Sequence, residues 1–118
     1  MARPHENLEA WRQSMALVKL IYATTRSFPK EKLFGLTSQM RRAAVSIPSN
    51  IAEGAARSSR REFAQFLNIA KGSLSELETQ LLISVDLGYL SRNHDAFQLA
   101  DYAARLLTGL HRKATSGK

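Results

Sequence analysis

The chain has 118 residues, no cysteine and a formal net charge of +7, from seventeen Lys and Arg against ten Asp and Glu. This length fits one domain with its own apolar core, and the lack of cysteine excludes disulfide scaffolds, cysteine-ligated metal sites and a thiol nucleophile. Charged residues interrupt the N-terminal segment, and no apolar run approaches the roughly 18 residues that span a bilayer. We therefore expect a cytoplasmic protein, without a secretory signal or membrane contact, whose positive charge favours anionic partners.

The first predicted helix covers about residues 7–27. Its apolar side chains recur at spacings of three and four, which is typical of one buried helix face; they are Leu8, Trp11, Met15, Val18 and Tyr22. The helix ends before Pro29, because the residue preceding a proline disfavours helical dihedrals. A connection with at most one helical turn follows, up to Gly35.

The second predicted helix covers residues 36–56 and buries a second apolar stripe, formed by Leu36, Met40, Ala43, Ile47 and Ile51. Pro48 lies inside this stripe. It has no backbone donor and its ring crowds the preceding turn, so we expect a kink near Pro48. The alternative is two short helices that break at Ser46.

The third predicted helix covers residues 60–87. Ser59 and Glu62 have the spacing of a capping box at its start, and Gly88 suits the position just after its end. Its apolar stripe has a heptad-like spacing that favours near-antiparallel packing; the stripe is Phe63, Leu67, Ala70, Leu74, Leu77, Leu81 and Val85. Gly72 weakens the helix interior, and we expect another backbone to approach closely there.

The fourth predicted helix covers residues 93–113, with Ser91 or Asn93 as its N-cap. Its stripe is Phe97, Ala100, Ala104, Leu107 and His111. Four amphipathic helices with short connections predict an all-α fold, an antiparallel up-down-up-down four-helix bundle that forms a single domain over residues 1–118. Surplus apolar residues beside the last two stripes favour self-association.

Charge is distributed unevenly along the chain. It sums to +3 over residues 1–35, +4 over 36–72, −4 over 73–104 and +4 over 105–118. In an up-down bundle the N-terminus, the second connection and the C-terminus share one end, which gathers Arg3, Arg57, Arg60, Arg61, Arg112, Lys113 and Lys118. Free backbone amides at the start of the third helix would add to the field there. The alternative is that these residues only aid solubility.

Signals for catalysis or metal binding are missing. No glutamate has a histidine three residues on, as di-iron bundles require, and His5, His94 and His111 are far apart in the sequence. We expect His111 to be a half-buried residue at the end of its stripe. No glycine-rich phosphate loop or nucleophile elbow occurs. We therefore expect no enzyme, no catalytic residues, no metal and no cofactor.

Two runs of sequence carry a resemblance to a known family. They are SIPSNIAEG at residues 46–54 and AKGSLSELE at residues 70–78, with Trp11 and the segment 87–90 in agreement at their flanks. Together they resemble the four-helix bundle family encoded in intervening sequences of bacterial 23S ribosomal RNA genes. The resemblance covers nearly the whole chain and implies an antiparallel bundle that forms homopentameric rings. The accessory variability proteins of diversity-generating retroelements are also similar; that similarity implies work with a reverse transcriptase and nucleic acid.

The motif residues of this family lie on two helices that should be neighbours; they are Gln39, Ser46, Pro48, Asn50, Glu53, Gly54, Gly72, Ser73 and Glu76. We interpret the polar ones as a buried or interfacial hydrogen-bond network that sets the register of the two helices. The alternative is a pocket for a ligand or an RNA base.

These observations predict a non-catalytic, homo-oligomeric scaffold that binds RNA or DNA backbones. The predicted contacts are Arg57, Arg60, Arg61, Arg112 and Lys113, with Arg41 and Arg42 as a second patch. Such contacts position a nucleic acid but do not read its sequence. The alternative is a protein-interaction adaptor that docks a partner enzyme such as a reverse transcriptase.

Overall fold

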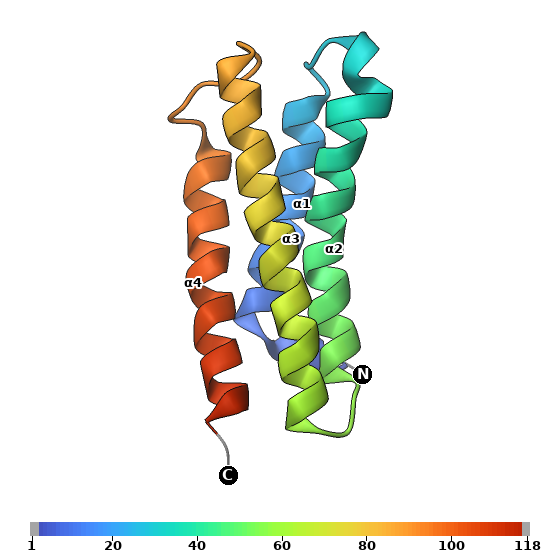
Figure 1. The fold of residues 1–118 in the computed structure, drawn as a ribbon, viewed down its shortest axis with the longest axis vertical. Helices are drawn as coiled ribbons and strands as arrows, with labels where there is room; N and C mark the ends of the chain where they lie inside the picture. The colour runs from blue at the N-terminus through green and yellow to red at the C-terminus, as the bar shows by residue number, and fades with distance from the viewer. Residues whose placement is uncertain (1–2, 117–118) are drawn as a thin grey trace.

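Four antiparallel helices form one bundle in the computed structural model, which describes residues 3–116 (Figure 1). They are α1 Glu9–Thr25, α2 Ser38–Ala55, α3 Arg60–Asp86 and α4 Asp95–Thr115. A 3-10 turn precedes α1 at Pro4–Asn7, while a 3-10 turn at Lys30–Lys32 and a π-helical turn at Leu33–Thr37 join α1 to α2. Every predicted helix bound is within two residues of the observed one, and the predicted up-down-up-down bundle is confirmed. Over residues 3–116, no helix is both long and apolar enough to cross a membrane.

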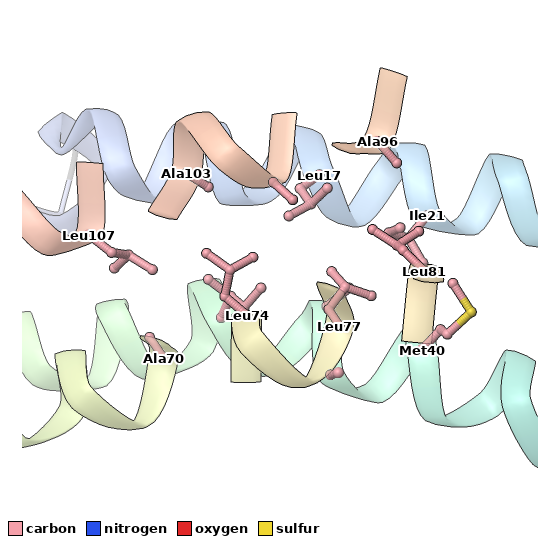
Figure 2. Packing of buried hydrophobic residues seen from close by; sticks show 14 of the residues in the cluster. Leu17, Ile21, Met40, Ala70, Leu74, Leu77, Leu81, Ala96, Ala103 and Leu107 are labelled. Atoms are coloured by element: carbon pink, nitrogen blue, oxygen red, sulfur yellow. The ribbon is translucent and has the colours of Figure 1, made fainter. Parts of the chain in front are cut away.

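One continuous apolar core runs along the bundle axis. Leu17 and Ile21 of α1 face Leu77 and Leu81 of α3 across it, and Met40 closes it from α2 (Figure 2). α4 contributes mainly small residues, Ala96, Ala100 and Ala103, with Leu107. Alanines allow close helix approach, so α4 packs tightly without large side chains. The predicted stripes of α2 and α3 are largely the buried ones.

The buried face of α1 differs from the predicted stripe. It consists of Ala10, Ser14, Leu17, Ile21 and Thr25, whereas Met15 is 39% exposed and Tyr22 is 38% exposed. Burial of the two hydroxyl groups is inexpensive because the helix backbone satisfies them: Ser14 Oγ donates to the Ala10 carbonyl at 2.6 Å and Thr25 Oγ1 to the Ile21 carbonyl at 2.7 Å. The predicted residues therefore lie beside the core, and two of them are exposed at the surface.

Helix α2 continues through Pro48 without a break, so the alternative of two short helices is wrong. Pro48 is buried and cannot donate to the carbonyl one turn earlier. Two residues on, the Asn50 side chain donates to the Ser46 carbonyl at 2.8 Å. This additional bond supports the helix in the turn where proline weakens it.

The close approach of two backbones occurs at Gly54, and the expectation for Gly72 is wrong. A Cβ at Gly54 would lie 2.7 Å from Phe66 Cβ and 3.0 Å from Phe63 Cδ1, both on α3. A Cβ at Gly72 would meet no atom within 4 Å, and this residue is exposed. Gly54 thus sets the spacing of α2 and α3 beside their connection.

The predicted boundaries of α3 are confirmed by its caps. Ser59 Oγ accepts a hydrogen bond from the Glu62 backbone N–H at 3.1 Å. At the other end Gly88 has φ +84°, and a Schellman motif forms. In it the Gly88 N–H donates to Val85 O at 3.0 Å and the Tyr89 N–H to Ser84 O at 2.9 Å.

The N-cap of α4 is His94, not Ser91 or Asn93 as predicted. His94 Nδ1 accepts the Ala96 backbone N–H at 3.0 Å, and His94 Nε2 lies 3.4 Å from Thr24 Oγ1 on α1. An imidazole nitrogen can replace the usual hydroxyl or carboxylate because it is an equally placed acceptor. The cap therefore ties the start of α4 to the end of α1.

Replacing His94 with alanine is expected to lower the free energy of unfolding by about 1 kcal/mol, the usual cost of a lost N-cap. His94→Asp is the matched variant, because a carboxylate at this position accepts the same backbone N–H. Chemical denaturation of both variants measures the difference. If His94→Asp proves as unstable as His94→Ala, capping is not the main role of the imidazole.

Candidate nucleic-acid interface

One end of the bundle is basic. The N-terminal turn, the α2–α3 connection and the end of α4 all lie there (Figure 1). The exposed basic residues at this end are Arg3, Arg57, Arg60, Arg61, Arg112 and Lys113; Lys118, which was predicted to join them, is outside the described residues. We call this set the basic end. Its composition follows from topology, because residues more than fifty positions apart meet there.

Two depressions share an arginine at the basic end. One, of about 320 Å³, is lined by Arg57, Arg60 and Phe63 among others. The second, of about 550 Å³, lies between α3 and α4 and is lined by Arg60, Arg61, Gln65, Asn68 and His111 among others. Arg60 therefore stands on the ridge between the two hollows. Guanidinium groups beside amide side chains offer the donors that phosphate and sugar oxygens accept.

The basic residues differ in whether they already form ion pairs or aromatic contacts within the chain. Arg57 Nη2 bonds to Glu53 Oε2 at 2.8 Å, and its guanidinium lies 4.9 Å over the Phe66 ring. Within residues 3–116, by contrast, Arg60 and Arg61 form no ion pair, nor do Arg112 and Lys113. Phe66 thus positions Arg57, while the other cations remain available to an external anion.

Arg41 and Arg42 do not form one patch. Arg41 Nε donates to Thr25 Oγ1 at 2.9 Å, and the guanidinium lies 4.6 Å over the Tyr22 ring. This arginine therefore joins α2 to α1. Arg42, one residue on, points to the other side of α2 and lines a groove against α3. Adjacent residues on a helix project about 100° apart, which separates the two side chains.

The structure brings three of the motif residues into hydrogen-bond contact. Ser46 Oγ and Ser73 Oγ are 2.8 Å apart across α2 and α3, and Asn50 Nδ2 donates to Ser46 Oγ at 2.9 Å. Gln39 and Glu76 are exposed in the adjoining groove. The remaining motif residues lie elsewhere: Glu53 beside Arg57, Gly54 against α3, Pro48 toward α1 and Gly72 at the surface.

Sequence reasoning missed an apolar groove between α1 and α2. It has a volume of about 350 Å³, and Trp11, Met15, Val18 and Val45 are among its lining residues. We call it the α1/α2 apolar groove. The sequence does contain a signal for this groove, because the first helix carries two adjacent apolar stripes and a bundle buries only one of them.

Beyond the basic end, the α3/α4 side, opposite this groove, carries two neighbouring acidic side chains, Glu78 and Asp101. Burial raises the pKa of Glu78, and the negative charge of Asp101 on α4 raises it further. Asp101 has a basic neighbour, Arg105, at 3.5 Å, whereas no ion pair of Glu78 occurs within residues 3–116. Leu82, one turn after Glu78, is 44% exposed. Glu78 is therefore unpaired within residues 3–116, and Leu82 leaves apolar surface beside it.

The described residues contain no group of three or more His, Cys, Asp or Glu side chains that could hold a metal ion.

A search of curated proteins found no match to the chain. The family model of the 23S rRNA-intervening sequence protein matches residues 6–109, which include all of α1, α2 and α3 and most of α4. The chain therefore belongs to the 23S rRNA-intervening sequence protein family.

Proposed function

We propose that this protein is a non-catalytic, homo-oligomeric scaffold that binds the backbone of RNA or DNA at its basic end. The observation that carries the proposal is the placement of Arg60, Arg61, Arg112 and Lys113 at one end of the bundle, exposed and without ion pairs within residues 3–116. Phosphates bound by these side chains would release condensed counterions, which supplies most of the affinity of such interfaces.

Self-association is the second part of the proposal. Each helix packs against its two neighbours in the order α1, α2, α3, α4 and back to α1, so the α1/α2 and α3/α4 sides are opposite one another. On the first side, each of Met15 and Tyr22 is followed one turn later by an exposed basic residue, Lys19 and Arg26 respectively. The second side offers Glu78, Asp101 and Leu82. These complementary sides favour a head-to-tail contact between copies, and such contacts form a ring when the rotation between copies closes.

Assembly would strengthen nucleic-acid binding. In a pentamer, the state that we propose, five chains of charge +7 together carry +35. A ring built from head-to-tail contacts sets all basic ends on one face, where they act on one polyanion. Such a field accelerates association at low salt, and linked sites bind more tightly than a single site.

The second candidate function is an adaptor that docks a partner enzyme such as a reverse transcriptase. The α1/α2 apolar groove favours it, because an exposed apolar hollow fits a protein side chain and not a phosphate. The two functions differ in what the chain binds alone. The scaffold binds nucleic acid without help, whereas the adaptor does so weakly.

The salt dependence of binding tests the scaffold. We expect the affinity for a fluorescent RNA to fall steeply between 50 and 200 mM salt. The slope of the logarithm of the binding constant against the logarithm of the salt concentration should be smaller for the Arg60→Ala/Arg61→Ala double variant. Each lost phosphate contact removes about 0.7 from the log–log slope on a single strand and about 0.9 on a duplex. Fluorescence anisotropy at several salt concentrations gives both slopes.

Lys30→Ala/Lys32→Ala is the matched control, since it removes the same charge from the opposite end of the bundle. This control should keep the wild-type slope apart from a small uniform loss of affinity. An affinity that does not change with salt, or equal slopes for the two double variants, would show that the basic end is not the binding surface. The adaptor would then be the better explanation.

A further inference from the structure

A polar groove lies between α2 and α3, away from the basic end. It has a volume of about 260 Å³, and its walls are Gln39 and Arg42 from α2 and Ser73 and Glu76 from α3. Ala43, which is 5% exposed, lies between the walls and leaves depth because its side chain is small. We call this hollow the α2/α3 polar groove.

The register of the two helices sets Arg42 and Glu76 opposite each other. Ser46 and Ser73 are in contact across the groove at 2.8 Å. Arg42 lies four residues before Ser46 and Glu76 three residues after Ser73, which is about one turn in each case. Because the helices are antiparallel, both steps run in the same direction. A cationic donor on one wall therefore faces an anionic acceptor on the other at the same level.

These two side chains are not used by the fold. Within residues 3–116, Arg42 and Glu76 make no ion pair with each other or with another residue, and no side-chain hydrogen bond is formed by Gln39. A facing Arg and Glu that remain apart leave room for a ligand between them. That ligand must present acceptors to Arg42 and donors to Glu76.

A guanine base meets this requirement. Its O6 and N7 are adjacent acceptors that an arginine binds in a bidentate manner, and its N1–H and N2 amino group are adjacent donors that suit the two oxygens of one carboxylate. Cytosine and adenine each have one amino group and no ring N–H beside it, so neither base offers the pair of adjacent donors that Glu76 would bind. We propose that the α2/α3 polar groove binds a guanine base of a single-stranded nucleic acid, an inference that rests on the proposed function.

The groove is within reach of a strand that is held at the basic end. Arg42 and Arg57 are fifteen residues apart on the α2 side, or about 22 Å along the helix axis. Ile69, which is 50% exposed, lies four residues before Ser73 on the same face of α3. Apolar side chains along such a path allow unpaired bases to stack. Phosphates would then be bound at the basic end while an unpaired base enters the groove, as in single-stranded recognition generally.

The test uses fluorescence anisotropy with labelled twelve-nucleotide oligouridine RNAs that carry guanosine, inosine, adenosine or cytidine at one central position, so that none of the strands is self-complementary. The unmodified protein should bind the guanosine RNA about tenfold more tightly than the adenosine RNA, the usual effect of one good bidentate base contact. Inosine lacks the N2 amino group, so its RNA should lie between the two. An oligothymidine strand with one central deoxyguanosine shows whether the same preference holds without the ribose hydroxyl.

Two variants assign the preference to the groove. Glu76→Gln and Arg42→Gln should each reduce the guanosine preference to less than threefold. Glu31→Gln and Lys30→Gln are exposed controls with the same changes of charge, and both should keep the guanosine preference. Since the affected side chains are exposed, circular dichroism should report an unchanged fold.

The outcomes separate this inference from the proposed function. Salt-dependent binding with equal affinity for all four RNAs overturns the guanine site and leaves the scaffold intact. A guanosine preference that survives both Glu76→Gln and Arg42→Gln overturns the placement in this groove. Failure to bind any RNA or DNA overturns the scaffold and, with it, this inference.

Discussion

Replacing Gly54 with alanine is expected to destabilise the bundle by about 1–3 kcal/mol, the usual cost of forcing an extra methyl into a packed contact. The new Cβ would lie 2.7 Å from Phe66 Cβ. That atom is fixed to the α3 backbone, so no change of rotamer relieves the overlap and the helices must separate. Alanine is favoured over glycine in a helix by up to about 1 kcal/mol, which is too small to offset this strain.

Gly72→Ala is the matched control for Gly54→Ala. A Cβ at Gly72 meets no atom within 4 Å, so only the helix propensity acts and stability should rise by up to about 1 kcal/mol. Urea unfolding of both variants beside the unmodified protein gives the two changes in free energy. Opposite signs are expected. A stable Gly54→Ala variant would mean that α2 and α3 can move apart at little cost.

Replacing Val45 with glutamate is expected to break the proposed assembly while the single bundle stays folded. Val45 is 40% exposed in the α1/α2 apolar groove. A free carboxylate there is solvated in a single chain. In a contact between copies it would be buried without a partner, which costs several kcal/mol, and it would face Glu78 and Asp101 on the α3/α4 side of the next chain.

Light scattering coupled to size-exclusion chromatography measures this effect as a fall to the mass of one chain. Gln98→Glu is the matched control, because it adds the same charge at an exposed position of α4. Loss of assembly should weaken nucleic-acid binding by about 100-fold, since linked sites gain that much from one another. An assembly that survives Val45→Glu would exclude the α1/α2 apolar groove as the contact between copies.

Local signals in the amino-acid sequence account for most of the fold. The spacing of apolar residues placed all four helices, and the capping box at Ser59 and the glycine at position 88 located the ends of α3. Such signals act within one or two turns of a helix, so they can be read without the rest of the molecule. The basic end was also predictable, because four antiparallel helices leave one arrangement of their termini.

Other features escaped prediction because they run against the usual preferences of their residue types. Ser14 and Thr25 are buried in α1 because the carbonyls of the same helix accept hydrogen bonds from their hydroxyl groups. A hydrophobicity scale ignores these bonds and therefore overstates the cost of burying the two side chains. His94 caps α4 although histidine is uncommon at that position. Asn93 and Ser91 were the better candidates by residue type alone.

Helix number, order and bounds thus follow from local periodicity and capping, as does the charge gathered at one end. Tertiary packing decided which stripe of α1 is buried, which glycine lies at the α2–α3 contact and whether neighbouring arginines share a surface. These depend on the rotation of each helix about its own axis, which only the competition among all four helices for one core can set. The same rotation directs Arg41 toward α1 and leaves Arg42 in the α2/α3 polar groove opposite Glu76.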